Sequence, residues 1–324
     1  MLEVYQFIII SLIVSLIIDL IFGELPTAIH PVVIIGKIID FFRNLFIKYR
    51  NRCSGFFTTI FTVIVSCLIL FLIMRISSFN DYLFFIIYSI VLSSTYSIKM
   101  LLSTAKSIEN DLKEDLDKAR KSVSYLVSRD TDELTESFIV SATIESMTEN
   151  ITDSYTAPIF YLTIVSIIFL LYNIDYYIIL LFIPFIYRIS NTLDAMLGYK
   201  TEELIDIGFF PAKLDDILNY IPARISGIFI VISAYLLRYN GKNAYEIMKR
   251  DARKCPSPNS GYTMAPTAGA LDIQLVKKDT YILGDDTHEI NVLDITKAIK
   301  ITSMTIGLFT IFILIILTII YMII

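Results

Sequence analysis

Six long apolar runs constrain this chain of 324 residues more than any other feature of its sequence. A helix of about 20 predominantly apolar residues is needed to cross the core of a bilayer. The chain is 55% hydrophobic and 18% charged, with a mean hydropathy of +0.67, which excludes an ordinary soluble domain. The runs cover residues 4–22, 56–76, 81–102, 155–172, 176–189 and 301–323. The sequence therefore predicts an all-α polytopic membrane protein with about six transmembrane helices.

A seventh apolar stretch, 220–237, is interrupted by Pro222, Arg224 and Gly227. Too few uninterrupted apolar residues remain for a full crossing, so we expect a re-entrant or interfacial helix there. The polar segments, where Lys and Arg are concentrated, are 23–55, 103–154 and 190–300. With six spans these segments share one side of the membrane, and the positive-inside rule makes that side the cytoplasm. We therefore expect one integral domain in the cell membrane, with helical cytoplasmic loops and both termini outside.

The composition also excludes several classes of function. A net charge of -5 does not suit nucleic-acid binding. The three cysteines are scattered without metal-binding spacing, so the sequence indicates neither a disulfide framework nor a zinc site. Two histidines, His30 and His288, are too few for a histidine-based metal centre, and no Ser-His-Asp or Cys-His set can be assembled from them.

An acidic stripe lies at the end of the polar segment 103–154. In a helix, Glu145, Glu149 and Asp153 would project from one face at positions i, i+4 and i+8, with Asn150 beside them. We expect this helix to start near Ser128, where a small polar residue precedes acidic ones. Three like charges repel one another, so the stripe is either a solvated face or a place where a cation or a basic partner binds.

Three further patterns each have a functional and a structural interpretation. Asp215 and Asp216, followed by Asn219, resemble the carboxylates that hold hydrated Mg²⁺, although acidic pairs also cap helices. The segment Ser257–Gly261 suits a phosphate held by backbone N–H groups, and equally any tight turn. Arg224 lies in an apolar stretch and requires a carboxylate or phosphate partner.

Two residues near the first span also carry alternatives. Asp19 lies one turn before the end of the run 4–22, where a carboxylate can extend to the membrane surface or serve a site. His30 precedes Pro31, a position that is more often structural than catalytic. Carboxylates, amides, arginines and a Ser/Gly turn, without a convincing nucleophile, favour Mg²⁺-assisted handling of phosphates over an acyl-enzyme mechanism.

These patterns, taken in order, resemble the cobalamin-biosynthesis CbiB/CobD family, the adenosylcobinamide-phosphate synthases. The resemblance extends from about residue 19 to residue 285. The segments that carry it are 19–26 with His30-Pro31, 129–131, 145–158, 191–194, 215–224, 257–261 and 268–271.

The resemblance implies an enzyme that joins (R)-1-aminopropan-2-ol, or its O-phosphate, to the free propionate of adenosylcobyric acid. ATP and Mg²⁺ are expected for this amide ligation, with membrane lipid and other late cobalamin-pathway enzymes as further partners. Activation of the carboxylate as an acyl phosphate, followed by attack of the amine, is the simplest route. The acidic residues would hold Mg²⁺ or orient the ammonium group and accept its proton, while the arginines and the Ser257–Gly261 turn would hold phosphate.

The resemblance assigns candidate roles residue by residue. The catalytic candidates are Glu145, Glu149, Asn150 and Asp153. The candidates for binding substrate or phosphate are Asp19, His30, Arg129, Asp130, Asn191, Asp194, Asn219, Arg224, Ser257, Asn259, Ser260 and Gly261. The candidates for holding Mg²⁺ are Asp215 and Asp216.

The chain departs from the family pattern at two positions. Ser141 stands where Arg is frequent, which puts one phosphate contact in doubt. Cys255 stands where His is frequent, which argues that a histidine there is not essential. The main alternative is a transporter or scaffold that binds a corrinoid without catalysis. Charges gathered at span ends and in loops, without an internal repeat, favour an enzyme.

Overall fold

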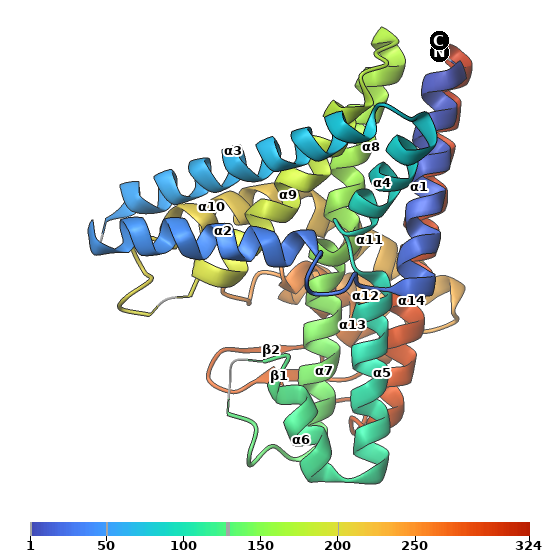
Figure 1. Ribbon diagram of the computed structural model, residues 1–324. Helices are drawn as coiled ribbons and strands as arrows, with labels where there is room; N and C mark the ends of the chain where they lie inside the picture. Colours follow the sequence, from blue (N-terminus) through green and yellow to red (C-terminus); the bar gives the residue numbers. More distant parts are fainter. Residues whose placement is uncertain (1, 50, 128–129, 200) are drawn as a thin grey trace. The chain divides into compact units, whose positions relative to one another are not determined.

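Figure 1 shows the computed structural model, which describes residues 2–49, 51–127, 130–199 and 201–324. The chain folds into two compact units. The first comprises Met1–Ile98, Ala157–Leu218 and Ile313–Ile324, and the second comprises Lys99–Thr156 and Asn219–Phe312. The second unit therefore holds the acidic stripe, Arg224 and the Ser257–Gly261 turn, whereas the first holds the remaining candidates from Asp19 to Asp216, apart from residues 129 and 130.

In the first unit, α2 packs against α3 and α9, α1 against α4, and α8 against α9. The elements of this unit are α1 (Leu2–Phe22), α2 (Pro31–Phe46), the 3-10 turn η1 (Ile47–Tyr49), α3 (Arg52–Ser77), α4 (Asp81–Ser93), α8 (Ala157–Tyr172), α9 (Tyr177–Leu197), α10 (Phe209–Leu218) and the last residues of α14 (Val292–Ile323). Asn51 Oδ1 accepts the Ser54 N–H at 2.9 Å, and Asn80 Oδ1 accepts the Leu83 N–H at 3.0 Å. These caps satisfy first-turn N–H donors, so they fix where α3 and α4 begin.

The second unit is built around helices with small side chains. Its elements are α5 (Ile98–Glu114), α6 (Leu116–Ser124), α7 (Glu136–Ile151), the π-helical turn η2 (Thr152–Thr156), α11 (Tyr220–Leu236), α12 (Gly241–Asp251), α13 (Gly261–Leu271), strands β1 (Leu275–Lys277) and β2 (Tyr281–Leu283), and most of α14. Helix α13 is almost wholly buried and packs against α11 and α12. A Cβ at Gly269 would lie 2.6 Å from the Asn243 carbonyl oxygen, so only glycine allows α12 and α13 to approach this closely.

Six helices of the described chain are long and apolar enough to cross a membrane, which confirms the predicted fold class of a multi-pass, all-α membrane protein. These segments are Glu3–Phe22, Arg52–Ser77, Asp81–Glu114, Glu136–Tyr172, Tyr177–Leu197 and Val292–Ile323. Helices α10 and α11 are separated by Asn219 alone. Only together are they long and apolar enough to cross a membrane, so the pair is either a broken span or a re-entrant loop. The expected re-entrant or interfacial helix at 220–237 therefore stays a prediction.

Two predicted boundaries differ from the structure. Within the expected span 81–102, α4 ends at Ser93 and α5 begins at Ile98, because the hydroxyls of Ser93, Ser94 and Thr95 bond to carbonyls three residues earlier. The helix expected near Ser128 begins at Glu136 instead. That helix continues through η2 into α8, so the stripe belongs to the same helical segment as the apolar run 155–172.

Candidate functional site

Glu145, the first residue of the acidic stripe, is a buried and hydrogen-bonded carboxylate. Its side chain lies on α7 with 3% of the residue exposed. Ser141 donates its hydroxyl to Glu145 Oε1 at 2.6 Å, and Tyr281 donates its hydroxyl to Glu145 Oε2 at 2.8 Å. Burial and the adjoining Glu145 carboxylate raise the pKa of Tyr281, so the phenol keeps its proton and remains a donor. Both oxygens of Glu145 are therefore held in place by hydroxyl groups of the second unit.

Glu149, one helical turn further on, has different surroundings. It is exposed, and within the described ranges no hydrogen bond or ion pair is formed by its carboxylate. Asp153, in the π-helical turn η2, Glu145 and Lys277 lie within its electrostatic reach. Asn150 is also exposed and donates to the Ser146 carbonyl at 2.8 Å. The predicted stripe thus combines a fixed buried carboxylate with a reachable one, and π-helical turns are frequent at functional sites.

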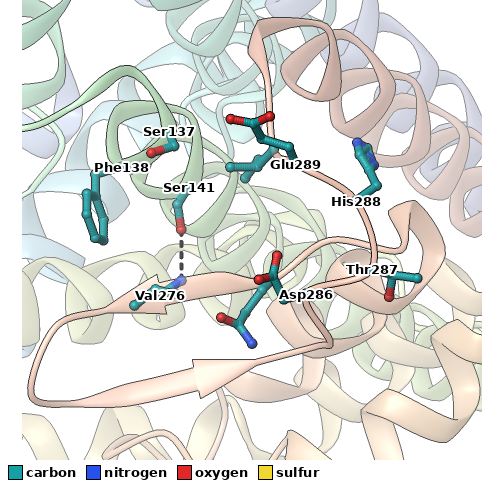
Figure 2. A pocket seen from close by; sticks show the side chains of 10 residues that line it. Ser137, Phe138, Ser141, Val276, Asp286, Thr287, His288 and Glu289 are labelled. Carbon is teal, nitrogen blue, oxygen red and sulfur yellow. Dashed lines mark hydrogen bonds between the residues drawn. The ribbon is translucent and has the colours of Figure 1, made fainter.

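A short hairpin, β1–β2, is attached to the same face of α7. The N–H of Val276 donates to Ser141 Oγ at 2.9 Å (Figure 2). Leu275 pairs with Leu283, and Lys277 pairs with Tyr281. Ser141 therefore connects the hairpin backbone to Glu145, a role that an arginine at this position could not fill in the same way, since arginine accepts no hydrogen bond.

Beside this junction lies a cleft of about 420 Å³ (Figure 2). Figure 2 labels eight of the side chains around it, including Ser137 and Ser141 of α7 and Asp286 and Glu289 of the loop before α14. The remaining lining residues include Gln274 and Ile290. The cleft lies outside every segment that carries the family resemblance, and Ser141, which lines it, is one of the two positions at which the chain departs from the family pattern.

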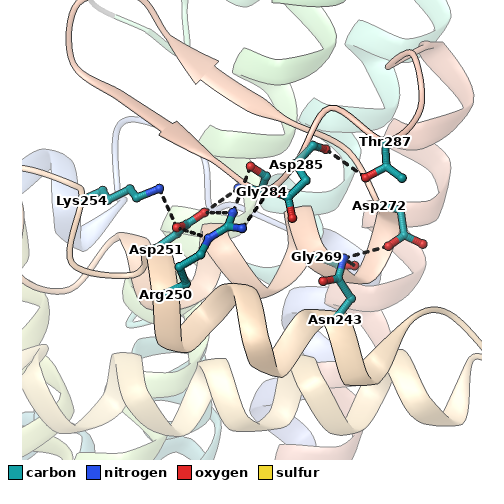
Figure 3. A network of polar contacts seen from close by, with 9 residues as sticks. All are labelled: Asn243, Arg250, Asp251, Lys254, Gly269, Asp272, Gly284, Asp285 and Thr287. Carbon is teal, nitrogen blue, oxygen red and sulfur yellow. Dashed lines mark hydrogen bonds and ion pairs between the residues drawn. The ribbon is translucent and has the colours of Figure 1, made fainter.

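The other end of the hairpin is attached to α12 by an ionic network (Figure 3). Asp251 is fully buried. Arg250 donates to both of its carboxylate oxygens at 2.8 Å, and the Gly284 N–H donates to one of them at 2.9 Å. Lys254 Nζ forms an ion pair with Oδ1 at 2.6 Å. Arg250 also donates to Asp285 at 2.8 Å. Burial opposes ionisation of Asp251, but these donors outweigh it and lower its pKa to about 2. The segment Gly284-Asp285 is therefore part of the scaffold that fixes the hairpin.

The Ser257–Gly261 turn has a clear structural basis. Ser257 Oγ accepts the N–H groups of Asn259 at 3.2 Å and Ser260 at 3.4 Å. A Cβ at Gly261 would lie 2.1 Å from the Ala252 carbonyl oxygen, so the turn requires glycine there. Asn259 and Ser260 are buried, and Ser260 is the residue before α13. The tight-turn interpretation is thus correct, and phosphate binding by the same residues stays a prediction.

Arg224 links α11 to this turn. Its guanidinium donates to Asn259 Oδ1 at 2.7 Å and to the Pro258 carbonyl at 3.0 Å. It also lies 3.6 Å from the ring centre of Tyr220 and 4.0 Å from that of Tyr262. A further bond runs from Nη1 to the Tyr220 carbonyl at 2.8 Å, so the arginine is stabilised without a carboxylate. Asn219, just before α11, is buried.

A second arginine, Arg253, lies close to the same tyrosine. Its hydrogen bond to the Tyr262 hydroxyl lowers the pKa of that group, although burial opposes the change. Two guanidinium groups and the N-terminus of the eleven-residue helix α13 fit a phosphate group. Arg253 and Lys277 were not predicted from the sequence, because nothing in their local sequence marks them. The bond between Tyr281 and Glu145 was not predicted either.

Cys255 belongs to the same neighbourhood as the acidic stripe. Burial raises the pKa of its thiol to about 11. The charges of Glu149 and Glu145 also raise this pKa, whereas a hydrogen bond with Ser260 and the charge of Lys277 lower it. The thiol is therefore neutral near pH 7. Glu145, Glu149, Lys277 and the turn before α13 all belong to the second unit.

Two candidates in the first unit, Asp19 and His30, accept backbone N–H groups at the starts of helices. Asp19 is buried, and its Oδ2 accepts the N–H of Ile98 at 3.1 Å. His30 Nδ1 accepts the Val32 N–H at 3.2 Å and so caps α2. Burial lowers the pKa of His30, Glu24 opposes this change and Arg188 reinforces it, which favours the neutral ring that can accept this bond.

The remaining candidates lie on α9 and α10 or in the loop before α7. Asn191 accepts a hydrogen bond from Arg188 at 3.2 Å, and Asp194 lies against Gly198 at the end of α9. Asp216 forms an ion pair with Lys213 at 3.0 Å, beside Asp215 on the same helix. Asp130 is exposed and accepts the Asp132 N–H at 3.0 Å. Arg129 lies outside the described residues.

The acidic side chains do not form a complete set of ligands for Mg²⁺ in the described chain. In the described chain, no group of three or more His, Cys, Asp or Glu side chains is arranged to hold a metal. Mg²⁺ commonly keeps several waters and takes only one or two carboxylates, together with substrate phosphates. Mg²⁺ at the acidic stripe, or at Asp215 and Asp216, therefore stays a prediction.

Comparison with known proteins places the chain in a family. The family model described as CobD/Cbib protein matches residues 12–317. The chain belongs to the CobD/Cbib family. It is 47% identical over 301 residues to the probable cobalamin biosynthesis protein CobD of Methanothermobacter thermautotrophicus, covering 92% of this chain and 94% of that protein.

Two other relatives are similar to this chain in sequence over comparable lengths. The probable cobalamin biosynthesis protein CobD of Methanocaldococcus jannaschii is 41% identical, covering 93% of this chain and 96% of that protein. The cobalamin biosynthesis protein CobD of Clostridium perfringens is 36% identical, covering 91% and 93%. No solved structure matches the chain. The resemblance predicted from the ordered motifs is therefore confirmed.

Proposed function

We propose that the protein is a membrane enzyme of cobalamin biosynthesis that forms adenosylcobinamide or its phosphate. In this reaction the amine of (R)-1-aminopropan-2-ol, or of its O-phosphate, forms an amide with the free propionate of adenosylcobyric acid. Membership of the CobD/Cbib family supports the pathway. The exposed carboxylate of Glu149, beside the fixed carboxylate of Glu145, is the observation that supports the chemistry.

The chain's own residues would act on the amine and on phosphate. Glu149 binds the substrate ammonium group, takes one of its protons and leaves the amine free to attack the activated carbonyl. Glu145, held by two hydroxyl donors, lies one helical turn before Glu149 and adds a second acidic side chain to the site. Arg224 and Arg253 bind phosphate near the start of α13.

ATP and Mg²⁺, when bound, would supply the activation that a carboxylate needs before it can form an amide. Bonds to Asn259 and to the Pro258 carbonyl hold the Arg224 guanidinium beside the turn before α13, where a phosphate would add to these contacts. We place these loops on the cytoplasmic side because the segments rich in Lys and Arg include them. Membrane lipid and other late cobalamin-pathway enzymes are the expected neighbours.

The decisive test is synthesis of the amide by the purified protein. The protein in detergent or lipid nanodiscs is incubated with adenosylcobyric acid, ATP, Mg²⁺ and aminopropanol phosphate, and the corrinoid is weighed by mass spectrometry. We expect a product with the mass of the amide, absent when ATP is omitted. Tight corrinoid binding without any product would instead favour the transporter or scaffold.

A further inference from the structure

An apolar cavity of about 150 Å³ lies within the first unit, lined by residues of α2, α3, α4, α9 and the loop before α2. Ser66 of α3 is the only polar side chain among the described residues that line it. Leu70 and Phe185 belong to its buried wall, whereas Ile29 and Ile73, which are 61% and 42% exposed, form its rim. An apolar cavity of this size stays free of water and accepts an apolar group as large as benzene.

The hydroxyl of Ser66 has no hydrogen-bond partner among the described residues, although this serine is only 2% exposed. Buried serines of other membrane helices donate to a carbonyl three residues earlier, as Ser11 and Ser93 do at 3.1 and 2.8 Å. Thr58 and Thr62 of α3 also lack a partner within the described chain, but neither lines the cavity. A water molecule would need about two to four polar partners, so it does not suit this site. A ligand with an oxygen acceptor would complete it.

The cavity opens beside a surface that faces lipid. Helix α3 is long and apolar enough to cross a membrane. Leu68, Leu72 and Ile76 are exposed at successive turns and therefore form a row along one side of this helix. An exposed apolar row on such a helix marks contact with the membrane. Ile69 and Ile73 of the cavity directly follow two residues of this row, so a ligand enters from the bilayer.

We propose that this cavity binds the alcohol end of a long-chain hydrocarbon from the bilayer, with the Ser66 hydroxyl donating to the oxygen of the ligand. Ser66 and Ile73 are about two helical turns apart, or roughly 10 Å along α3. The oxygen therefore lies deep in the cavity, and the hydrocarbon extends towards the rim. No basic side chain of the described residues lines the cavity, so a carboxylate or phosphate group would be buried there without a partner.

The test is photo-crosslinking of the full-length protein in lipid nanodiscs. The two probes are a long-chain primary alcohol with a diazirine in its chain and the same chain ending in a methyl group. Mass spectrometry of peptides measures saturable labelling of the segments 25–38 and 66–73. One neutral hydrogen bond should let the alcohol saturate these segments at an about twofold to tenfold lower content in the bilayer. Ser66→Ala should remove this preference and keep the labelling by the hydrocarbon.

Ser11→Ala is the matched control, because Ser11 is equally buried and its hydroxyl already bonds to the Ile8 carbonyl. It should keep the preference for the alcohol. Ser66→Leu fills part of the cavity and should prevent labelling by both probes, with folding checked by thermal unfolding.

The proposal is wrong if the native protein does not distinguish the probes or if Ser66→Ala keeps the preference. Labelling confined to the row of Leu68, Leu72 and Ile76, or labelling that does not saturate, would mean contact with bulk lipid and would also refute it. None of these variants changes the acidic stripe, so the outcome is independent of the proposed function.

Discussion

The polar residues of the first unit and those of the second unit differ in what surrounds them. In the first unit, Asp19 and His30 are buried and accept backbone N–H groups at the starts of α5 and α2. In the second unit, Glu145 is equally buried, but its partners are hydroxyls from α7 and β2, and Glu149 one turn away is exposed. Buried polar residues of the motifs therefore have two roles in this protein. Those of the first unit cap helices, whereas Glu145 of the second unit lies one turn from an exposed carboxylate that a ligand can reach.

The largest effect is expected from Glu149→Gln. Removing a general base reduces rates by about 10²-fold to 10⁴-fold, so amide formation should fall by that amount while the protein remains folded. Glu136→Gln changes an exposed carboxylate at the start of the same helix and should keep nearly native activity. Activity is measured by mass spectrometry of the corrinoid product. Equal activity of the two variants would remove Glu149 from the mechanism.

Asp251→Asn tests the scaffold of the second unit. Breaking a buried ion pair by removing one partner costs about 3–5 kcal/mol, because the other charges remain. We expect a loss of stability of this size in unfolding experiments in detergent. Glu246→Gln on the same helix removes an exposed carboxylate 3.9 Å from Lys249 and should change stability by less than about 1 kcal/mol. A small effect of Asp251→Asn would mean that the hairpin does not depend on the network.

Tyr281→Phe removes one donor to the buried Glu145 carboxylate. Hydrogen bonds to charged groups contribute about 1.5–3 kcal/mol, so the variant should be destabilised by that amount. Tyr245→Phe removes an exposed hydroxyl on α12 and serves as the control. Unfolding is followed by circular dichroism. If the two variants were equally stable, Glu145 would not need its second hydroxyl partner.

A pH experiment addresses the first unit through His30. The pKa of His30 is lowered in the folded state, so the unfolded state binds more protons as the pH falls below about 6.5. Stability should therefore decrease on acidification from pH 6.5 towards the lowered pKa. His30→Asn should keep the helix cap and lose this pH dependence, whereas His30→Ala should lose about 1 kcal/mol at pH 7.5. Unchanged pH dependence in His30→Asn would assign the effect to another group.

The smallest effect concerns the thiol of Cys255, whose pKa is about 11. Lys277→Met should raise this pKa and Glu149→Gln should lower it, since the lysine stabilises the thiolate and the glutamate opposes it. Ultraviolet absorbance of the thiolate, with Cys53 and Cys67 replaced by Ala, should show thiolate fractions that differ about twofold to fivefold between the variants. Identical titrations would place these charges too far from the thiol to act on it.

Much of the fold follows from local properties of the sequence. The length and apolarity of the six runs predicted six membrane helices, because each run meets the bilayer requirement by itself. The interruption between α4 and α5 was not predicted, since it depends on hydroxyls that bond to their own helix and on Asp19 far away in the sequence. The start of α7 at Glu136 was also missed, because several polar residues before it could have begun a helix.

The candidate site was predicted only in part. The stripe itself follows from the spacing of Glu145 and Glu149, which any helix converts into one face. That one carboxylate is buried and the other exposed could not be predicted, because Tyr281 reaches Glu145 from a hairpin more than a hundred residues later. Mg²⁺ at Asp215 and Asp216 and the phosphate contacts of Arg129 stay predictions.

The bond between Tyr281 and Glu145 also has a consequence for the synthesis of the protein. Its two residues are 136 positions apart, so α7 leaves the ribosome well before the hairpin that completes it. Until then Glu145 lacks the Tyr281 hydroxyl, although Ser141, its donor within the same helix, is already present. A chain truncated before residue 281 would keep the α7 sequence yet lack this second donor. Translation must therefore reach the hairpin before the acidic stripe can take its final form.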